Sequence, residues 1–442
     1  MRQAAKVENS LLILLLTTTI TVIFPALDRV GMQPDEIQIA QLARQFSSSG
    51  ISNVFDGHGA DFPGNFYAYL VSVTMNFFHL PDIYAVRMPS AIIITLLTGA
   101  MLLFRGQDEK PSKAFLAALL FLSSYTVSSL AYHANTATVM SLFFIFALSS
   151  LFQWIKRPST EKAWLLTASA ACSTIFMGIL APAIACAVGG IFILLQGGKR
   201  KKLFLKMIFY AIAATLTAYF TVLFITNDRQ SADNVLGIAQ ITDHLEEYGK
   251  IQSFLAHTFF SIFPWSVPII VALFWIACNP SWLRNKFLAL TLLKQFGVII
   301  FLITIPTLFA VNRLSLVMLL ATIYFNMPVI SSFLLSQIHN HSVTWRITGG
   351  IFAVLIAMLA VMFVIHTYGF TINLAGYELE PSDGWTIWKI LLLCGIAASL
   401  YTLWRNQRTI RFNNRYLYNI VILYLFAQIL YKAYINPFLT TV

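Results

Sequence analysis

Residues 137–155 read ATVMSLFFIFALSSLFQWI, 19 consecutive residues without a charged side chain. About 20 mainly apolar residues are enough for an α-helix to cross the hydrocarbon core of a bilayer. The rest of the chain repeats this pattern, since 58% of its 442 residues are hydrophobic and only 11% are charged. Soluble domains carry about 25% charged residues, so this composition excludes a soluble enzyme, a disordered protein, a coiled coil and a nucleic-acid-binding protein. The sequence predicts an all-α polytopic membrane protein.

Thirteen apolar segments are expected to cross the membrane. The first follows Arg2 and Lys6, but no cleavage site of small residues comes after it, so we interpret it as a span and not as a signal peptide. The predicted spans lie at about Leu11–Ala26, Met88–Phe104, Ala114–Tyr132, Ala137–Ile155, Ala163–Leu180, Pro182–Gln196, Leu203–Thr226, Phe254–Ala277, Phe296–Val311, Leu314–Leu335, Ile347–Ile365, Thr386–Trp404 and Tyr416–Tyr434.

The distribution of charge predicts which side each loop occupies. With the N-terminus inside, 21 of the 29 Lys and Arg residues lie on the inner side and 14 of the 18 Asp and Glu residues on the outer side. Basic residues concentrate in cytoplasmic loops of membrane proteins. We therefore expect a multi-pass protein of the plasma (inner) membrane, with a cytoplasmic N-terminus and an extracytoplasmic C-terminus. The basic run Lys199–Lys202 then anchors the topology and contributes to binding anionic lipid.

Three outer loops carry most of the remaining polar residues: 27–86, 227–253 and 366–385. Because little else lies outside the spans, we expect residues 1–442 to form a single transmembrane domain without a soluble C-terminal domain. In the first outer loop, Phe66–Leu80 is apolar but short for a span, which favours a helix lying along the outer membrane surface. The alternative is a genuine span, which would invert the topology of everything after it.

Two adjacent carboxylates, Asp35 and Glu36, directly follow Pro34 in this first outer loop. Proline suits the first turn of a helix, so the acids are expected at a helix start, where the helix dipole favours them. Helix capping is one sufficient explanation for acids at this position. The second interpretation is a general base beside an apolar surface, since a partly buried carboxylate can accept a proton from a substrate.

Four motifs occur in order over roughly the first 320 residues. They are Pro34-Asp35-Glu36, the stretch Asp61–Leu70, the stretch Val86–Ala91, and Phe263-Pro264-Trp265 with His257 shortly before it. Together they resemble the bacterial protein O-mannosyltransferase family, which includes the lipid A aminoarabinose transferases and belongs to the GT-C glycosyltransferases. The resemblance implies a GT-C-like membrane enzyme that moves a hexose or pentose from a polyprenyl-phosphate donor to a protein, lipid or glycan acceptor on the extracytoplasmic face, with inversion.

The resemblance also implies roles for particular residues. Asp35 matches the leading acid of its motif and Glu36 is its companion, so both are expected to be catalytic. Arg313 and Arg87 are expected to bind the donor phosphate, because cations stabilise charge on a leaving group; the alternative for both is an arginine that reaches the membrane interface. Further substrate-binding candidates are Asp61, Asn65, Tyr67, His133, Asn135, His257 and Trp265.

The sequence departs from the family pattern in two places. Where the family often has an acid near the outer start of the fourth span, residues 131–138 contain none, and His133 and Asn135 are the polar residues there. The Lys-Gly-Pro element between the fifth and sixth spans lacks its lysine at residues 178–182. These departures leave an altered or inactive enzyme, and a structural subunit, as alternatives.

No cofactor is expected with certainty. A divalent cation is the one candidate, because histidine and carboxylate together suit zinc, although no ligand spacing supports it. The residues concerned are His58, His79, His133, His244, His257, His366, Asp61 and Glu246.

Two other functions remain open. A transporter or flippase of lipid-linked saccharides predicts charged residues at mid-bilayer depth, which the predicted spans almost lack. A polysaccharide polymerase or ligase predicts basic residues in a large, late outer loop, whereas residues 366–385 contain no Lys or Arg. Both are therefore less favoured than the transferase.

Overall fold

The chain is mainly helical in the part that the computed structural model describes: residues 12–13, 15–16, 19–20, 23, 27, 32–49, 62–103, 111–195, 201–226, 292–307, 312–339, 372–374 and 377–379. Its helices are α2 (Pro34–Ser49), α4 (Phe62–Phe78), α5 (Asp82–Leu103), α6 (Pro111–Leu122), α7 (Tyr125–Tyr132), α8 (Thr136–Lys156), α9 (Thr160–Met177), α10 (Leu180–Leu195), α11 (Lys201–Thr226), α17 (Leu292–Thr307) and α18 (Asn312–His339). Two short strands, β1 (Ile372–Leu374) and β2 (Tyr377–Leu379), pair antiparallel with Asn373 opposite Glu378.

Within these described residues, three helices are long and apolar enough to cross a membrane: α5, α8 and α11. Helices α6 and α7 would form a fourth span if they act together, although a bend of 61° separates them. Where the sequence predicts one continuous span over Ala114–Tyr132, the chain therefore has two helices. The predicted spans beyond residue 340 and the one at 254–277 lie outside the described residues, so the total of thirteen stays a prediction.

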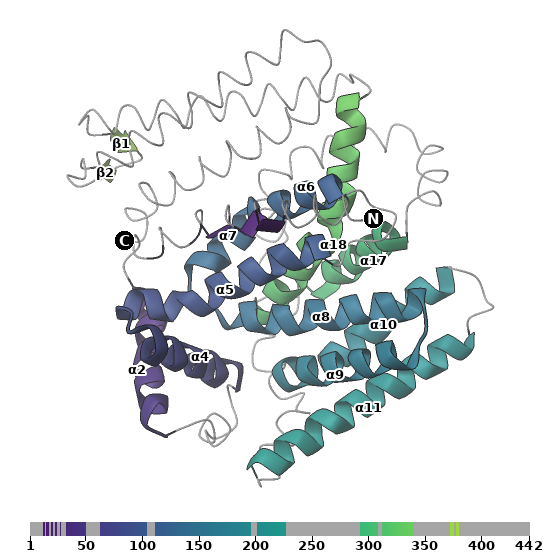
Figure 1. Ribbon diagram of the computed structural model, residues 1–442, viewed down its shortest axis with the longest axis horizontal. Helices are drawn as coiled ribbons and strands as arrows, with labels where there is room; N and C mark the ends of the chain where they lie inside the picture. The colour runs from purple at the N-terminus through teal and green to yellow at the C-terminus, as the bar shows by residue number, and fades with distance from the viewer. Residues whose placement is uncertain are drawn as a thin grey trace.

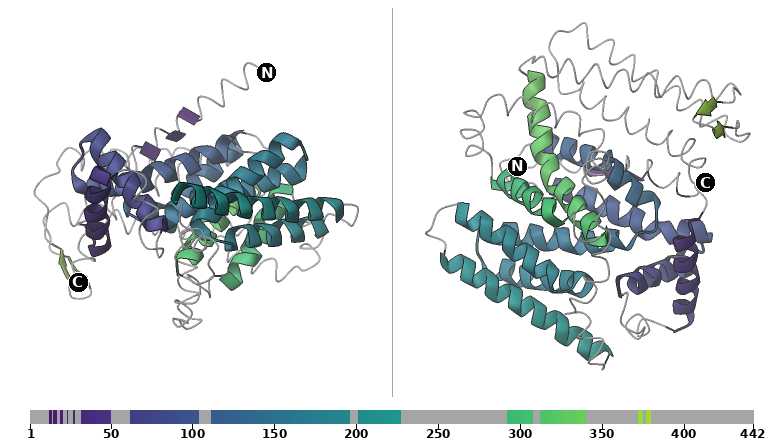
Figure 2. Two further views of the ribbon diagram at one scale, coloured as in Figure 1. Left: turned by 90° about the horizontal axis from the view of Figure 1, so that it is seen from below. Right: turned by 180° about the vertical axis from the view of Figure 1, so that it is seen from behind.

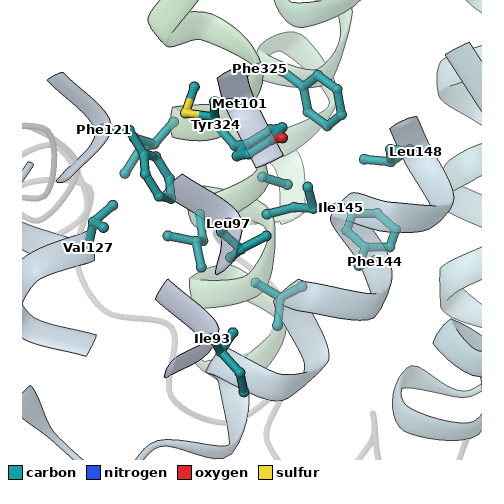
Figure 3. Packing of buried hydrophobic residues seen from close by; sticks show 14 of the residues in the cluster. Ile93, Leu97, Met101, Phe121, Val127, Phe144, Ile145, Leu148, Tyr324 and Phe325 are labelled. Atoms are coloured by element: carbon teal, nitrogen blue, oxygen red, sulfur yellow. The ribbon is translucent and has the colours of Figure 1, made fainter. Parts of the chain in front are cut away.

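Helix α8 lies in the middle of the bundle and α11 at its edge (Figure 1). In α8, 78% of the apolar stretch is buried inside the protein, whereas in α11 only 17% of it is buried. Figure 3 shows the core around α8, where Phe144 and Ile145 belong to the same buried cluster as Leu97 of α5 and Tyr324 of α18. This difference predicts that α11 contacts lipid along most of its length.

Where α11 meets the middle of α9, its buried residues are small. Ala214 and Ala218 pack against Ala170 and Ala171 of α9, while Phe224 on the opposite side is 89% exposed. Small side chains let helix backbones approach closely in membranes, where no hydrophobic effect drives helices together. The exposed aromatic residues are therefore covered by acyl chains in a bilayer and not by another part of the described chain.

Helices α17 and α18 form a second close contact. A Cβ atom on Gly297 would lie only 2.6 Å from the carbonyl oxygen of Phe325, so only glycine allows the two backbones to approach this closely. The Asn326 side-chain amide donates to the Gly297 carbonyl at 3.0 Å, and the hydroxyls of Thr304 and Thr322 lie 2.6 Å apart. Neutral polar groups therefore join this pair inside the apolar bundle.

Helices α2 and α4 lie together at one end of the bundle, beside the start of α5 (Figures 1 and 2). The predicted helix in the first outer loop is confirmed as α4, which buries Tyr67 and Val71 and exposes Val73, Phe77 and Phe78. Its orientation relative to the membrane, and the single-domain organisation of residues 1–442, stay predictions.

Candidate functional site

A buried ion pair joins α2 to α5. The Arg87 guanidinium donates from Nε to Glu36 Oε1 at 2.9 Å and from Nη2 to Glu36 Oε2 at 2.6 Å. The two side chains are 1% and 2% exposed, respectively. Two parallel hydrogen bonds between a guanidinium and a carboxylate fix the relative orientation of both groups. The start of α2 is thus attached to the first turns of α5.

Backbone groups complete this contact. Glu36 lies three residues after Gln33, and the Gln33 N–H donates to Glu36 Oε2 at 3.0 Å. This hydrogen bond is one of the two that make up a capping box at the start of a helix, here α2. The N–H of Ala134 donates to Glu36 Oε1 at 3.0 Å, and Arg87 Nη1 donates to the carbonyl of Leu27 at 2.6 Å. The Glu36 carboxylate therefore accepts four N–H groups, which occupies its lone-pair directions.

These donors determine the charge of Glu36. Burial opposes the ionised form and raises its pKa, but the nearby His133 ring, the Arg87 guanidinium and the Ala134 amide outweigh burial and lower the pKa to about 2. A carboxylate with this pKa and four N–H donors is a poor acceptor for a substrate proton at neutral pH. The geometry favours a positioning role for Glu36.

Asp35 has the opposite environment although it is the preceding residue. It lies in the first turn of α2 and is exposed, whereas Glu36 is 1% exposed. Successive residues of a helix point about 100° apart, so anchoring Glu36 inward holds Asp35 at the surface of the same turn. Of the two adjacent acids, Asp35 is therefore the one that lies at the surface.

A second polar chain connects α4, α5 and α8. The Tyr67 hydroxyl donates to the carbonyl of Val86 at 2.9 Å and lies 2.8 Å from Ser90 Oγ, which lies 3.3 Å from Thr138 Oγ1. Burial raises the pKa of Tyr67 above its usual range, so its hydroxyl stays protonated. Ser90 was not predicted as a site residue; the signal was its place in the Val86–Ala91 motif.

The segment between α7 and α8 lies against the ion pair. Asn135 caps α8, with its side-chain oxygen accepting from Ala137 N at 2.8 Å. His133 Nδ1 is enclosed, lies 3.9 Å from Glu36 Oε1 and has no hydrogen-bond partner among the described residues. The His133 side chain as a whole is 21% exposed. This segment therefore places an incompletely paired imidazole next to Glu36.

The structure brings together many of the predicted site residues at one end of the bundle: Asp35, Glu36, Tyr67, Arg87, His133 and Asn135. Asn65 is partly exposed in the first turn of α4. Arg313 lies in the first turn of α18, where only the backbone is described. Asp61, His257 and Trp265 lie outside the described residues. Binding of phosphate by Arg87 and Arg313 and substrate binding by the other candidates stay predictions.

The divalent-cation hypothesis gains no support from the described part of the chain, where no group of three or more His, Cys, Asp and Glu residues could hold a metal ion. His79 and His133 are the two histidines of the predicted set that lie within it. The hypothesis therefore rests on residues outside it.

No protein-family model matches the chain. Over 219 residues it is 27% identical to the undecaprenyl phosphate-α-4-amino-4-deoxy-L-arabinose arabinosyl transferase 2 of Proteus mirabilis, a match that covers 47% of this chain. The matched region spans 38% of the length of that protein.

Two crystal structures of ArnT from Cupriavidus metallidurans have a similar fold. The structure bound to undecaprenyl phosphate has a TM-score of 0.62 at 13% identity and covers 95% of this chain and 77% of that one. The apo structure has a TM-score of 0.59 at 14% identity, with 96% and 77% covered. The resemblance inferred from the motifs is thus confirmed in sequence and in fold: the chain has an ArnT-like, polytopic membrane fold.

Proposed function

We propose that the chain is a cell-envelope glycosyltransferase that moves a sugar from a polyprenyl-phosphate donor to an acceptor on the extracytoplasmic face of the inner membrane. The curated relative is named for an undecaprenyl-phosphate sugar donor, and one structure with the same fold holds undecaprenyl phosphate. The observation that carries the proposal is the exposed Asp35 carboxylate on a turn that the buried Glu36–Arg87 pair fixes in place.

The proposed reaction inverts the configuration at the anomeric carbon. An acceptor oxygen forms a bond to this carbon while its bond to the phosphate oxygen breaks, and the electron pair leaves with the lipid phosphate. Asp35 takes the proton from the acceptor hydroxyl, since a carboxylate within reach of the attacking oxygen can do so. Arg313 supplies positive charge near the leaving phosphate, because donors and cations at developing charge lower the barrier.

In this proposal, Glu36 and Arg87 affect the reaction by holding Asp35 in position. Their ion pair joins the turn that carries Asp35 to α5 and to the segment before α8. A catalytic group must be held close to its productive geometry, and a displacement of about 1 Å costs about 100-fold in rate. The proposed acceptor is a protein, lipid or glycan. The proposal also places the N-terminus in the cytoplasm and the C-terminus on the extracytoplasmic side.

The test is sugar transfer by the purified full-length protein with a panel of undecaprenyl-phosphate sugars. Asp35→Asn should lower the transfer rate by about 10² to 10⁴-fold, because general base catalysis contributes that much. Its thermal stability should stay unchanged, because the side chain is exposed.

The matched control is Glu161→Gln, which removes another exposed acid in the first turn of a helix, at the opposite expected side of the membrane. It should transfer sugar at the wild-type rate. Equal activity of Asp35→Asn and wild type would disprove the role of Asp35. Movement of lipid-linked saccharide across vesicles without any sugar transfer would support the flippase instead.

A further inference from the structure

The end of α8 and the start of α11 carry basic side chains that the proposed function does not use. We propose that Lys156 of α8 and Lys206 of α11 together bind the phosphate group of an anionic phospholipid at the cytoplasmic surface of the membrane. This surface lies at the opposite end of the bundle from Asp35, so the proposal is independent of the proposed function.

Helix α8 separates the two ends. Its 21 residues run from Thr136, next to the segment that contacts Glu36, to Lys156. An α-helix of this length extends about 30 Å, which matches the hydrocarbon core of a bilayer. When α8 crosses the membrane, Lys156 therefore lies at the surface opposite to the buried ion pair, on the side where the cytoplasmic loops are predicted.

Helix α11 begins where α8 ends. The four helices α8, α9, α10 and α11 follow one another along the chain and lie side by side (Figure 1). The Tyr210 ring of α11 packs edge-on against the Trp154 ring of α8, with 5.3 Å between the ring centroids. Trp154 belongs to the last turn of α8 and Tyr210 to the first half of α11. The first turns of α11 therefore lie beside the end of α8.

A second contact places the two lysines at the same height in the bundle. A Cβ atom on Gly189 of α10 would lie 2.5 Å from the Met207 sulfur and 3.5 Å from Ile155 Cδ1, so Met207 and Ile155 meet at this point. Lys206 directly precedes Met207, and Lys156 directly follows Ile155. Packing thus brings together two lysines that are 50 residues apart in the sequence.

This end of the bundle has an excess of positive charge. Lys202 and Lys206 are exposed and Lys156 is partly exposed. Residues 110–227 contain ten basic residues and a single acidic one, Glu161. Acids of this stretch therefore leave most of its positive charge uncompensated, and each lysine ammonium has three N–H donors for an anion.

The surface near the lysines is apolar. Trp164 of α9 is 73% exposed, and Leu205 and Phe209 of α11 are each 66% exposed. A ligand at this surface meets basic groups and hydrocarbon side chains within a few helical turns. A phospholipid has both matching parts, a phosphate and acyl chains, and basic pockets between helices on the cytoplasmic side bind phospholipid head groups.

A role in membrane topology alone is the alternative. Orientation depends on how many basic residues a loop carries, and it does not require lysines of different helices to meet. A lipid site requires this meeting. The two explanations therefore differ in what the loss of Lys156 and Lys206 does to lipid binding by the folded protein.

The experiment measures binding of dioleoylphosphatidylglycerol to the purified full-length protein by native mass spectrometry. Dioleoylphosphatidylethanolamine, which has the same acyl chains but no net charge, is the comparison, and wild type should bind it more weakly. Lys156→Gln/Lys206→Gln should lower the affinity for phosphatidylglycerol about 30-fold, because each basic residue near an anionic lipid surface contributes about a factor of five. Its affinity for phosphatidylethanolamine should stay unchanged.

Two further double variants separate charge and place. Lys156→Arg/Lys206→Arg keeps both charges and should bind phosphatidylglycerol as wild type does. The matched control is Arg44→Gln/Lys113→Gln, which removes the same charge elsewhere. Arg44 is exposed on α2, and Lys113 lies in the first turn of α6, which packs on α5 and α18. This control should also bind phosphatidylglycerol as wild type does.

Thermal unfolding in detergent first establishes that each variant is folded. If the Gln double variant does not fold, Lys206→Gln replaces it, because this side chain is exposed, and it should show a loss of about fivefold. Four results would overturn the inference: unchanged affinity without the lysines, an equal loss in the control, weak binding by the Arg variant, or equal affinity of wild type for both lipids. Competition by glycerol phosphate as strong as by phosphatidylglycerol would show a site for a soluble phosphate and would also overturn it.

Discussion

Helices α2 and α5 are joined by two ion pairs with opposite arrangements of charge. Glu36 of α2 pairs with Arg87 of α5, whereas Arg44 of α2 pairs with Asp82 of α5. In the first pair the side chains are 2% and 1% exposed; in the second, Arg44 is 62% and Asp82 41% exposed. The residue types are equivalent, so burial is the main difference between the two contacts.

The difference explains why, among the described residues, the buried pair has further hydrogen-bond partners. A buried charge is costly unless its partner and additional hydrogen bonds replace the lost water, and Glu36 receives two backbone N–H groups besides Arg87. An exposed pair keeps much of its water and gains little free energy. Burial, and not the presence of an ion pair, therefore identifies the contact on which the geometry of the site depends.

The largest expected effect comes from breaking the buried pair. Arg87→Met should lower the free energy of unfolding by about 3 to 5 kcal/mol, because it leaves the Glu36 carboxylate buried without its cation. Thermal unfolding of the purified protein in detergent measures this loss. Arg87→Lys is the control; it keeps the charge but not the two parallel donors, so its stability should be intermediate. An Arg87→Met variant as stable as wild type would contradict the interpretation of this contact.

Acid should weaken the buried pair by a smaller amount. The pKa of Glu36 is lowered from 4.5 to about 2 in the folded protein. Its stabilisation is therefore complete above about pH 4.5 and disappears as the pH falls toward 2, a change of about 3 kcal/mol. Unfolding midpoints measured between pH 7 and pH 2.5 check this, with Glu36→Gln as the reference that lacks the titrating group. Parallel curves for the two proteins would disprove the assignment.

The smallest effect is expected at the exposed pair. Arg44→Ala should change the free energy of unfolding by less than about 1 kcal/mol, because water and salt screen a pair with this exposure. The same unfolding assay in low and high salt measures it, and Asp82→Asn should give a matching result. A loss as large as that of Arg87→Met would remove the distinction between the two pairs.

The apolar helices were largely predictable from the sequence. Apolar runs at 88–104, 137–155 and 203–226, of which only the last contains a charged residue, Lys206, predicted spans that correspond to α5, α8 and α11. The break between α6 and α7 was not predictable from apolar length, because Ser123 and Ser124 look like ordinary small residues of a membrane helix. In the structure both hydroxyls donate to the Leu120 carbonyl at 3.0 Å, which satisfies a backbone group at the bend.

The site was predictable as a set of residues but not as a geometry. The motifs identified Asp35, Glu36 and Arg87, because acids after a proline and an arginine before an apolar run are recognisable locally. That Glu36 and Arg87 pair with each other could not be read from spacing, since 51 residues separate them. The roles of Tyr67 and Ser90 depend equally on how α4 packs on α5, which no local pattern encodes.

The partners of Glu36 also set an order of events during synthesis at the membrane. Arg87 follows Glu36 by 51 residues and Ala134 follows it by 98. A chain made from its N-terminus exposes this carboxylate to water until those later segments have been inserted, so the first outer loop cannot take its final shape early. The turn that carries Asp35 is therefore completed only after the chain has been made as far as the start of α8.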